Sequence, residues 1–207
     1  MAKDYSEDLL IQKSTAELLE QELGWKSVYA FDNEVLGEQG TLGRKSQHEV
    51  VLTRHLRMAL KRLNPWMTDK QLTEAIERMT SYMSSQTLMQ INEEKYQYLR
   101  DGVPVTRLKP NGETEQVRAR VIDFVNVDNN EFIAVRELWI KGPIHKRRAD
   151  VVCFVNGLPL IFIELKNHDQ DIQNAYTDNY RDYLDTIPHL FHHNAMIMLS
   201  NGMESRV

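Results

Sequence analysis

The stretch that decides the fold is residues 150–166, with the sequence DVVCFVNGLPLIFIELK. Two nearly continuous apolar runs, 151–155 and 160–163, flank Asn156-Gly157, a dipeptide typical of a tight turn between paired strands. Strands that are apolar on both faces lie in the middle of a sheet that is covered on both sides. The stretch therefore predicts a buried central hairpin.

Charged side chains mark the ends of this hairpin. Asp150 begins the first strand, and Glu164 and Lys166 end the second, where an uncompensated charge is costly. A three-residue loop, 156–158, would place Asp150 opposite Glu164 on one sheet face, with Cβ atoms roughly 5 Å apart, and Lys166 would point the same way. A two-residue loop would shift the register by one and put the acids on opposite faces.

The residue types at these positions indicate phosphodiester chemistry. Two close carboxylates repel each other unless a proton or a divalent cation lies between them, and oxygen ligands suit Mg²⁺. The ammonium group of Lys166 would orient or help to deprotonate an attacking water and stabilise charge in the transition state. The spacing alone also fits a structural ion pair between Lys166 and one of the acids, so both interpretations stay open at this point.

The sequence around the hairpin predicts an α/β (α+β) fold in which a central mixed β-sheet is flanked by helices. Apolar periodicity predicts helices over about 9–23, 46–63, 68–83 and 87–99, with Ser46-x-x-Glu49 and Thr68-x-x-Gln71 in capping-box form and Met79 and Met83 on one apolar stripe. Alternation then predicts strands at 117–121 and 132–135, and a helix near 172–184 and a last strand at 196–199 follow the hairpin. We expect a mainly helical part, 1–102, that packs on a core, 103–207.

The amino-acid composition limits the location of the protein and the kinds of partner that it can bind. The chain has 42% hydrophobic residues, no apolar run long enough to span a bilayer and no secretory signal, so we expect a cytoplasmic protein without a membrane partner. Its one cysteine, Cys153, lies in an apolar run and is expected to be a buried small hydrophobe. A net charge of −5 requires any DNA contact to be local. Two basic clusters exist, of which the first is interpreted as a solvated helix face: Arg54, Arg57, Lys61 and Arg62, and then Lys141, His145, Lys146, Arg147 and Arg148.

The pattern Asp150-x13-Glu164-x-Lys166 resembles the signature of the restriction-endonuclease-like PD-(D/E)xK nucleases, with Ala149 where proline is frequent. A wider match resembles the amino-terminal region of type I restriction enzyme R (HsdR) subunits and covers most of the chain. The matching segments are 49–52 leading to 59–65, 148–152, 159–167, and 187–191 leading to 200–202.

This resemblance implies roles for individual residues. Asp150, Glu164 and the backbone carbonyl of Leu165 would bind Mg²⁺, and Lys166 would assist hydrolysis. A Gln-x-x-x-Tyr element that shapes the family's site falls on Asn179 and Tyr183, so asparagine replaces the usual glutamine. The family's upstream acid corresponds to Glu49 or Glu20, between which the sequence does not choose. The residues expected to approach the DNA backbone are Lys146, Arg147, Arg148 and Asn167.

The resemblance also implies a larger assembly. ATP-driven motor domains would follow this module, and since the chain holds no G-x-x-x-x-G-K-[ST] loop, ATP would bind in the missing part. We expect double-stranded DNA and the methylation and specificity subunits as partners, and cleavage away from the recognition site. Two alternatives remain: a non-catalytic docking module of the same fold, and a repair or junction nuclease.

Overall fold

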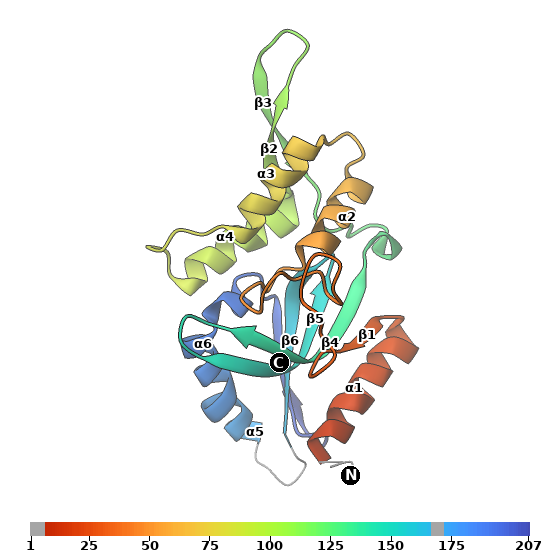
Figure 1. The fold of residues 1–207 in the computed structure, drawn as a ribbon, viewed down its shortest axis with the longest axis vertical. Helices are drawn as coiled ribbons and strands as arrows, with labels where there is room; N and C mark the ends of the chain where they lie inside the picture. The colour runs from red at the N-terminus through yellow and green to blue at the C-terminus, as the bar shows by residue number, and fades with distance from the viewer. Residues whose placement is uncertain (1–6, 167–171) are drawn as a thin grey trace.

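A mixed six-stranded sheet forms the centre of the protein (Figure 1). The computed structural model describes residues 7–166 and 172–207. The strand order is β1-β4-β5-β6-β7-β8; β1 pairs with β4 and β6 with β7 in parallel, and the other neighbours are antiparallel. The bounds are β1 Lys26–Tyr29, β4 Phe132–Lys141, β5 Lys146–Val155, β6 Leu158–Leu165, β7 Met196–Ser200 and β8 Ser205–Arg206. The predicted fold class is confirmed, whereas β1 and β8 were not predicted.

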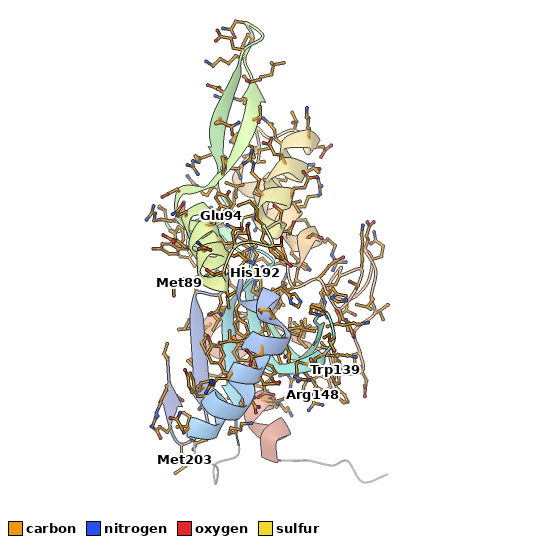
Figure 2. The ribbon with its side chains drawn as sticks, turned by 90° about the vertical axis from the view of Figure 1, so that its left-hand side faces the viewer. Met89, Glu94, Trp139, Arg148, His192 and Met203 are labelled. Atoms are coloured by element: carbon orange, nitrogen blue, oxygen red, sulfur yellow. The ribbon has the colours of Figure 1, made fainter. Side chains whose placement is uncertain are left out.

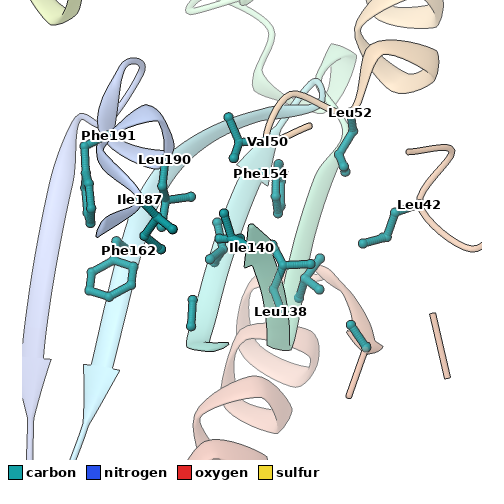
Figure 3. Close-up of a cluster of buried hydrophobic side chains, with 14 of the residues drawn as sticks. Leu42, Val50, Leu52, Leu138, Ile140, Phe154, Phe162, Ile187, Leu190 and Phe191 are labelled. Atoms are coloured by element: carbon teal, nitrogen blue, oxygen red, sulfur yellow. The ribbon is translucent and has the colours of Figure 1, made fainter. Parts of the chain in front are cut away.

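Helices cover both faces of this sheet. Helix α1 (Glu7–Leu23) lies on one face, where Leu19 and Trp25 pack on a buried cluster that includes Cys153. The other face is covered by a π-helical segment η2 (Ala175–Tyr180) that continues from α5 (Ile172–Asn174), then by α6 (Arg181–Thr186) and η3 (Pro188–Phe191). Phe162 of β6 meets the rings of Tyr183 and Phe191 there at 5.4 and 5.3 Å between centroids, in the core shown in Figure 3.

A second group of elements packs beside the end of the sheet. It comprises α2 (Thr53–Leu63), α3 (Asp69–Thr80), α4 (Leu88–Asp101) and the hairpin β2 (Val103–Leu108)–β3 (Thr114–Ala119), which forms the far tip in Figure 1. A short η1 (Val127–Asn129) leads from it into β4. Thr68 and Thr87 close capping boxes at the starts of α3 and α4. The division of the chain at residue 102 stays a prediction.

Two predicted details of the helices are wrong. Helix α2 begins at Thr53, because residues 46–49 form a separate turn and the N–H of Leu52 donates to the carbonyl of Gly157 at 2.8 Å. Helix α3 ends at Thr80, so Met83 lies beyond it and is 63% exposed, whereas Met79 is fully buried. The ammonium group of Lys95 binds the carbonyls of Arg78 and Ser81, both at 2.6 Å, and thereby satisfies the end of the helix.

The central hairpin reaches the expected register by an unexpected route. Its turn has two residues, Asn156 and Gly157, whose φ values of 52° and 82° fit a type I′ turn, so the three-residue loop is not observed. Val155 therefore faces Leu158, but a β-bulge follows and Cys153 faces Ile161. The bulge adds back the residue that the shorter turn removes. From Val151 opposite Ile163, the next rung brings Asp150 opposite Glu164.

No helix in the described ranges, 7–166 and 172–207, is long and apolar enough to cross a membrane.

Candidate active site

Asp150 lies where the β5–β6 ladder opens. The last paired residues are Val151 and Ile163, and beyond them the side chain of Asp150 takes over as a backbone acceptor. Its Oδ2 accepts the N–H of Leu165 at 2.8 Å, and its Oδ1 accepts the side-chain amide of Gln12 at 3.1 Å. Gln12 comes from α1 and is buried, so two fixed donors hold the carboxyl group across the gap between the strands.

Glu164 is the more deeply buried acid, with 1% of its surface exposed. The amide of Asn179 donates to its Oε1, and the ammonium nitrogen of Lys166 lies 3.9 Å from the same atom. The hydroxyl of Tyr183 lies beside this carboxyl group and donates to the carbonyl of Arg148 at 2.9 Å. The other oxygen, Oε2, is buried and has no hydrogen-bond partner among the described residues.

The two acids meet at the strand ends without sharing one sheet face. Glu164 alternates with Ile163 and Leu165, which face α1, so its partner Asn179 comes from the opposite layer. Side chains two residues apart in a strand normally face the same side, but the two neighbours of Asp150 do not. Ala149 packs in the core under α6, whereas Val151 packs in the cluster under α1. The regular alternation of β5 therefore breaks at Asp150. The shared face predicted from strand alternation is therefore wrong. The carboxyl groups approach each other across the open end of the ladder instead.

The electrostatics of this pair favour a bound cation. Burial raises the pKa of Asp150 to about 6, and the charge of Glu137 adds to the effect, against the opposing N–H of Leu165. Burial also raises the pKa of Glu164 well above its usual value, and the charge of Asp150 raises it further. Full ionisation of both acids thus needs a compensating positive charge. The Oε2 atom of Glu164, which has no hydrogen-bond partner in the described part of the chain, offers a ligand for a cation. These residues fit a divalent cation.

Within residues 7–166 and 172–207, no three His, Cys, Asp or Glu side chains are arranged as a metal-binding cluster. Any cation here would thus rely on the two carboxylates, backbone oxygen and water, a ligand set typical of Mg²⁺.

Sequence reasoning missed two residues of the site. One is Gln12, for which the sequence carries no local signal. The other is Glu137 of β4, which lies opposite Asp150, is 2% exposed and adopts a φ of 58°. The sequence does carry a signal for Glu137. The buried core positions of β4 change from odd to even numbers between Val135 and Leu138, which indicates an irregularity in the strand at this point. Non-glycine residues with positive φ are uncommon and concentrate at functional sites.

Glu49 and Glu20, the two upstream acids proposed from the sequence, make contacts away from the acid pair. Glu49 accepts the N–H of Lys45 at 3.1 Å and lines a separate cavity of about 500 Å³ beside His48. Glu20 is exposed on α1. The third carboxylate beside Asp150 is therefore Glu137.

The predicted DNA-contact residues fall into three groups. Arg147 pairs with Asp182 of α6, with its Nη2 2.9 Å from Oδ1. Arg148 pairs with Glu137 at 2.6 Å, and Lys146 lies 4.1 Å over the ring of Trp139. Asn167 lies outside the described residues.

The basic cluster on α2 is partly structural. Arg54 donates to the carbonyls of Glu38, Gly40 and Thr41, and Arg62 donates to Asn129 and to the side chain of Asn156. These contacts brace the loops around the hairpin turn, so the interpretation as a mere solvated face is wrong for these two arginines.

A mixed, helix-covered sheet with an acid pair at its open end defines the class: this is an α/β protein of the restriction-endonuclease-like type. The sequence profile described as "Type I restriction enzyme R protein N terminus" matches residues 4–207. The chain belongs to that family, as the amino-terminal region of a type I restriction enzyme endonuclease subunit.

Curated relatives agree with this assignment. The type I restriction enzyme HindI endonuclease subunit of Haemophilus influenzae is 34% identical over 191 residues, 90% of this chain and 18% of that protein. A putative type I restriction enzyme MjaIXP endonuclease subunit of Methanocaldococcus jannaschii is 26% identical over 99% of this chain and 19% of its own length. A Staphylococcus aureus subunit is 27% identical over 89% and 19%. The chain thus spans about a fifth of the length of these relatives.

Proposed function

We propose that this chain is the Mg²⁺-dependent endonuclease module of an ATP-dependent type I restriction-modification enzyme, which hydrolyses DNA phosphodiester bonds away from the recognition site. The observation that carries the proposal is the pair formed by half-buried Asp150 and fully buried Glu164. One carboxylate oxygen of Glu164 has no hydrogen-bond partner among the described residues, and the Lys166 ammonium nitrogen lies 3.9 Å from the other oxygen. A structural ion pair alone would not account for a second carboxylate held against it at the end of a buried hairpin.

The residues of the site divide the work of hydrolysis. Asp150, Glu164 and the carbonyl of Leu165 would hold Mg²⁺, which when bound polarises the scissile phosphate and lowers the pKa of a bound water. Gln12 and the N–H of Leu165 orient Asp150, while Asn179 and Tyr183 orient Glu164. Lys166 positions the attacking water and stabilises negative charge that develops on the phosphate.

The surrounding machine lies outside this chain. We assign ATP binding and DNA translocation to the remainder of the subunit, and base recognition to separate specificity and methylation subunits. Double-stranded DNA is the substrate, and a cytoplasmic location follows from that substrate. This module would then cut with little regard to base sequence, because no part of the proposed chemistry reads a base.

The test uses the full subunit assembled with its partners. Asp150→Asn and Glu164→Gln should each abolish DNA cleavage, measured on a circular plasmid, while ATP hydrolysis continues at the wild-type rate. Glu20→Gln, which removes an exposed charge from α1, is the matched control and should cut normally. If Asp150→Asn cuts as well as the control, the chain is a docking module and the nuclease proposal is overturned.

A further inference from the structure

Three aromatic rings lie in series beside the candidate site, each with a cation over it. Tyr29 stacks 6.4 Å from Phe31, which stacks 6.2 Å from Trp139. Arg136 lies 5.1 Å from the centre of the Tyr29 ring and Arg148 lies 4.9 Å from that of Phe31. Lys146 and Arg148 share Trp139, at 4.1 and 5.7 Å. We call Arg136, Lys146 and Arg148, with the three rings beneath them, the cation strip.

The strip is built into the strand register. Trp139 of β4 faces Arg148 of β5, and two residues further Lys141 faces Lys146 directly. Figure 2 labels Trp139 and Arg148, which lie next to each other. Like charges directly opposite each other destabilise an antiparallel pair. Within residues 7–166 and 172–207 no carboxylate forms an ion pair with Lys141 or Lys146, whereas Arg148 is paired with Glu137. The fold therefore tolerates a concentration of positive charge at the two lysines although the chain as a whole is acidic.

The strip leads to the acid pair. Lys146 and Arg148 are alternate residues of β5, on the side of the strand opposite the buried Ala149. Asp150, two residues further on, accepts a hydrogen bond from Gln12 of α1. Arg147, between Lys146 and Arg148, points to the other layer and is held by Asp182. A polyanion that follows the strip therefore arrives at Asp150.

We propose that the cation strip binds the phosphate backbone of duplex DNA on its way to the acid pair, an inference that rests on the proposed function. The rings already carry cations and neighbouring rings, so they fix the direction of the charged groups and do not offer open faces for unpaired bases. Pre-oriented cations lose less side-chain entropy when they bind phosphate. The strip thus selects a double-stranded backbone without base preference.

The test measures binding of this chain to a short labelled duplex of arbitrary sequence in EDTA, by fluorescence anisotropy over a series of salt concentrations. Lys146→Gln should weaken binding and reduce the slope of log K against log salt by about 0.9, the loss of one phosphate contact. Trp139→Leu keeps every charge, so it should leave the slope unchanged and weaken binding about two- to fivefold, the range of a surface cation–π contact.

Matched variants make the result decisive. Lys61→Gln removes one exposed charge from α2 and should leave binding as in the wild type, and Trp139→Phe, which keeps a ring, should restore most of the affinity lost in Trp139→Leu. The proposal is overturned if the Lys146 and Lys61 variants behave alike, if the wild-type chain does not bind duplex at low salt, or if it prefers a single strand and Trp139→Leu removes that preference. Because no divalent cation is present, these outcomes are independent of whether Asp150 and Glu164 cut DNA.

Discussion

The N–H of Leu165 donates to the Oδ2 atom of Asp150 at 2.8 Å, across the gap where β5 and β6 stop pairing. A side chain thus occupies the position of a backbone acceptor in the next rung of the ladder. Because Leu165 directly follows Glu164, this one bond also sets the spacing of the two acids. The consequences of holding a half-buried charge in this way can be measured.

Asp150→Asn should stabilise the fold while it destroys the proposed site. The pKa of Asp150 is raised to about 6, so above that pH the ionised group costs folding free energy that it does not cost in the unfolded chain. The rise from 3.8 to about 6, at about 1.4 kcal/mol per pKa unit, means that removal of the charge should raise the free energy of unfolding at pH 8 by about 3 kcal/mol in EDTA. Urea denaturation measures it.

The matched control for that experiment is Asp185→Asn, an exposed acid on α6, which should change stability little. Mg²⁺ should raise the melting temperature of the wild type and not that of Asp150→Asn. A destabilised Asp150→Asn would show that the carboxylate is a net structural contact.

Glu137→Gln should shift the pH dependence of cleavage by the assembled enzyme. The charge of Glu137 raises the pKa of Asp150, while that of Arg148 lowers it. Loss of the Glu137 charge removes the first effect and frees Arg148 from its 2.6 Å ion pair, so both changes lower the pKa of Asp150. The acid limb of the rate profile should therefore move to lower pH. A profile that keeps its midpoint while the maximum rate falls would indicate a purely structural role.

Gly157→Ala should be among the more damaging small substitutions in the chain. Gly157 has a φ of +82°, and an added Cβ would lie 2.5 Å from the carbonyl oxygen of Leu52 and 2.9 Å from the nitrogen of Leu56. We expect a loss of about 2 to 4 kcal/mol in the free energy of unfolding.

Gly112→Ala is the control that separates backbone strain from the steric clash. Gly112 has a φ of +85° but open space around it, so this substitution should cost only the strain, about 1 kcal/mol. Equal losses in both variants would contradict the close approach between the hairpin turn and α2.

His193→Gln should flatten the acid side of the stability profile. Burial lowers the pKa of His193 to about 3, so the folded chain keeps this imidazole neutral while the unfolded chain binds a proton below pH 6.5. The contribution of His193 is present above pH 6.5 and is lost as the pH falls towards 3. Between pH 6 and 4 the wild type should lose up to about 1.4 kcal/mol per pH unit more than the variant.

Asp150 and Glu164 also make stability depend on pH, in the opposite direction, but they do so equally in the wild type and in His193→Gln. The difference between the two stability profiles therefore reports His193 alone. His145→Gln, an exposed histidine, is the control and should follow the wild type. Parallel profiles for the wild type and His193→Gln would refute the effect.

The predictions that the structure confirms depend on short-range chemistry. The Asn156-Gly157 turn, the capping box of Thr68 and the doubly apolar strands are each decided within a few residues, and so are readable from the sequence. The register between β5 and β6 could not be read from the sequence in this way. It depends on a β-bulge whose energetic cost is balanced by packing on both faces of the sheet. Pro159 was the available hint, since proline cannot donate to a ladder and is confined to edges and bulges.

The charged residues of the candidate site could be predicted from the sequence, whereas the residues that hydrogen-bond to them and hold them in place could not. Asp150, Glu164 and Lys166 belong to one hairpin, so spacing along the chain could relate them. Gln12 is 138 residues from Asp150 in sequence, and its side chain reaches the site only because α1 packs on the sheet. Contacts of this kind follow from tertiary packing, for which local sequence gives no rule.

The paired turn and bulge between Val155 and Ile161 also limit how this gene can change in length. Deletion or insertion of one residue in either feature alone would turn every following side chain of β6 over, so that Glu164 would face α1 and Ile163 would face Asn179. Two changes of opposite sign would cancel. Relatives of this chain should therefore keep the number of residues between the acids constant, or vary it in compensating steps, even where the identities of those residues drift.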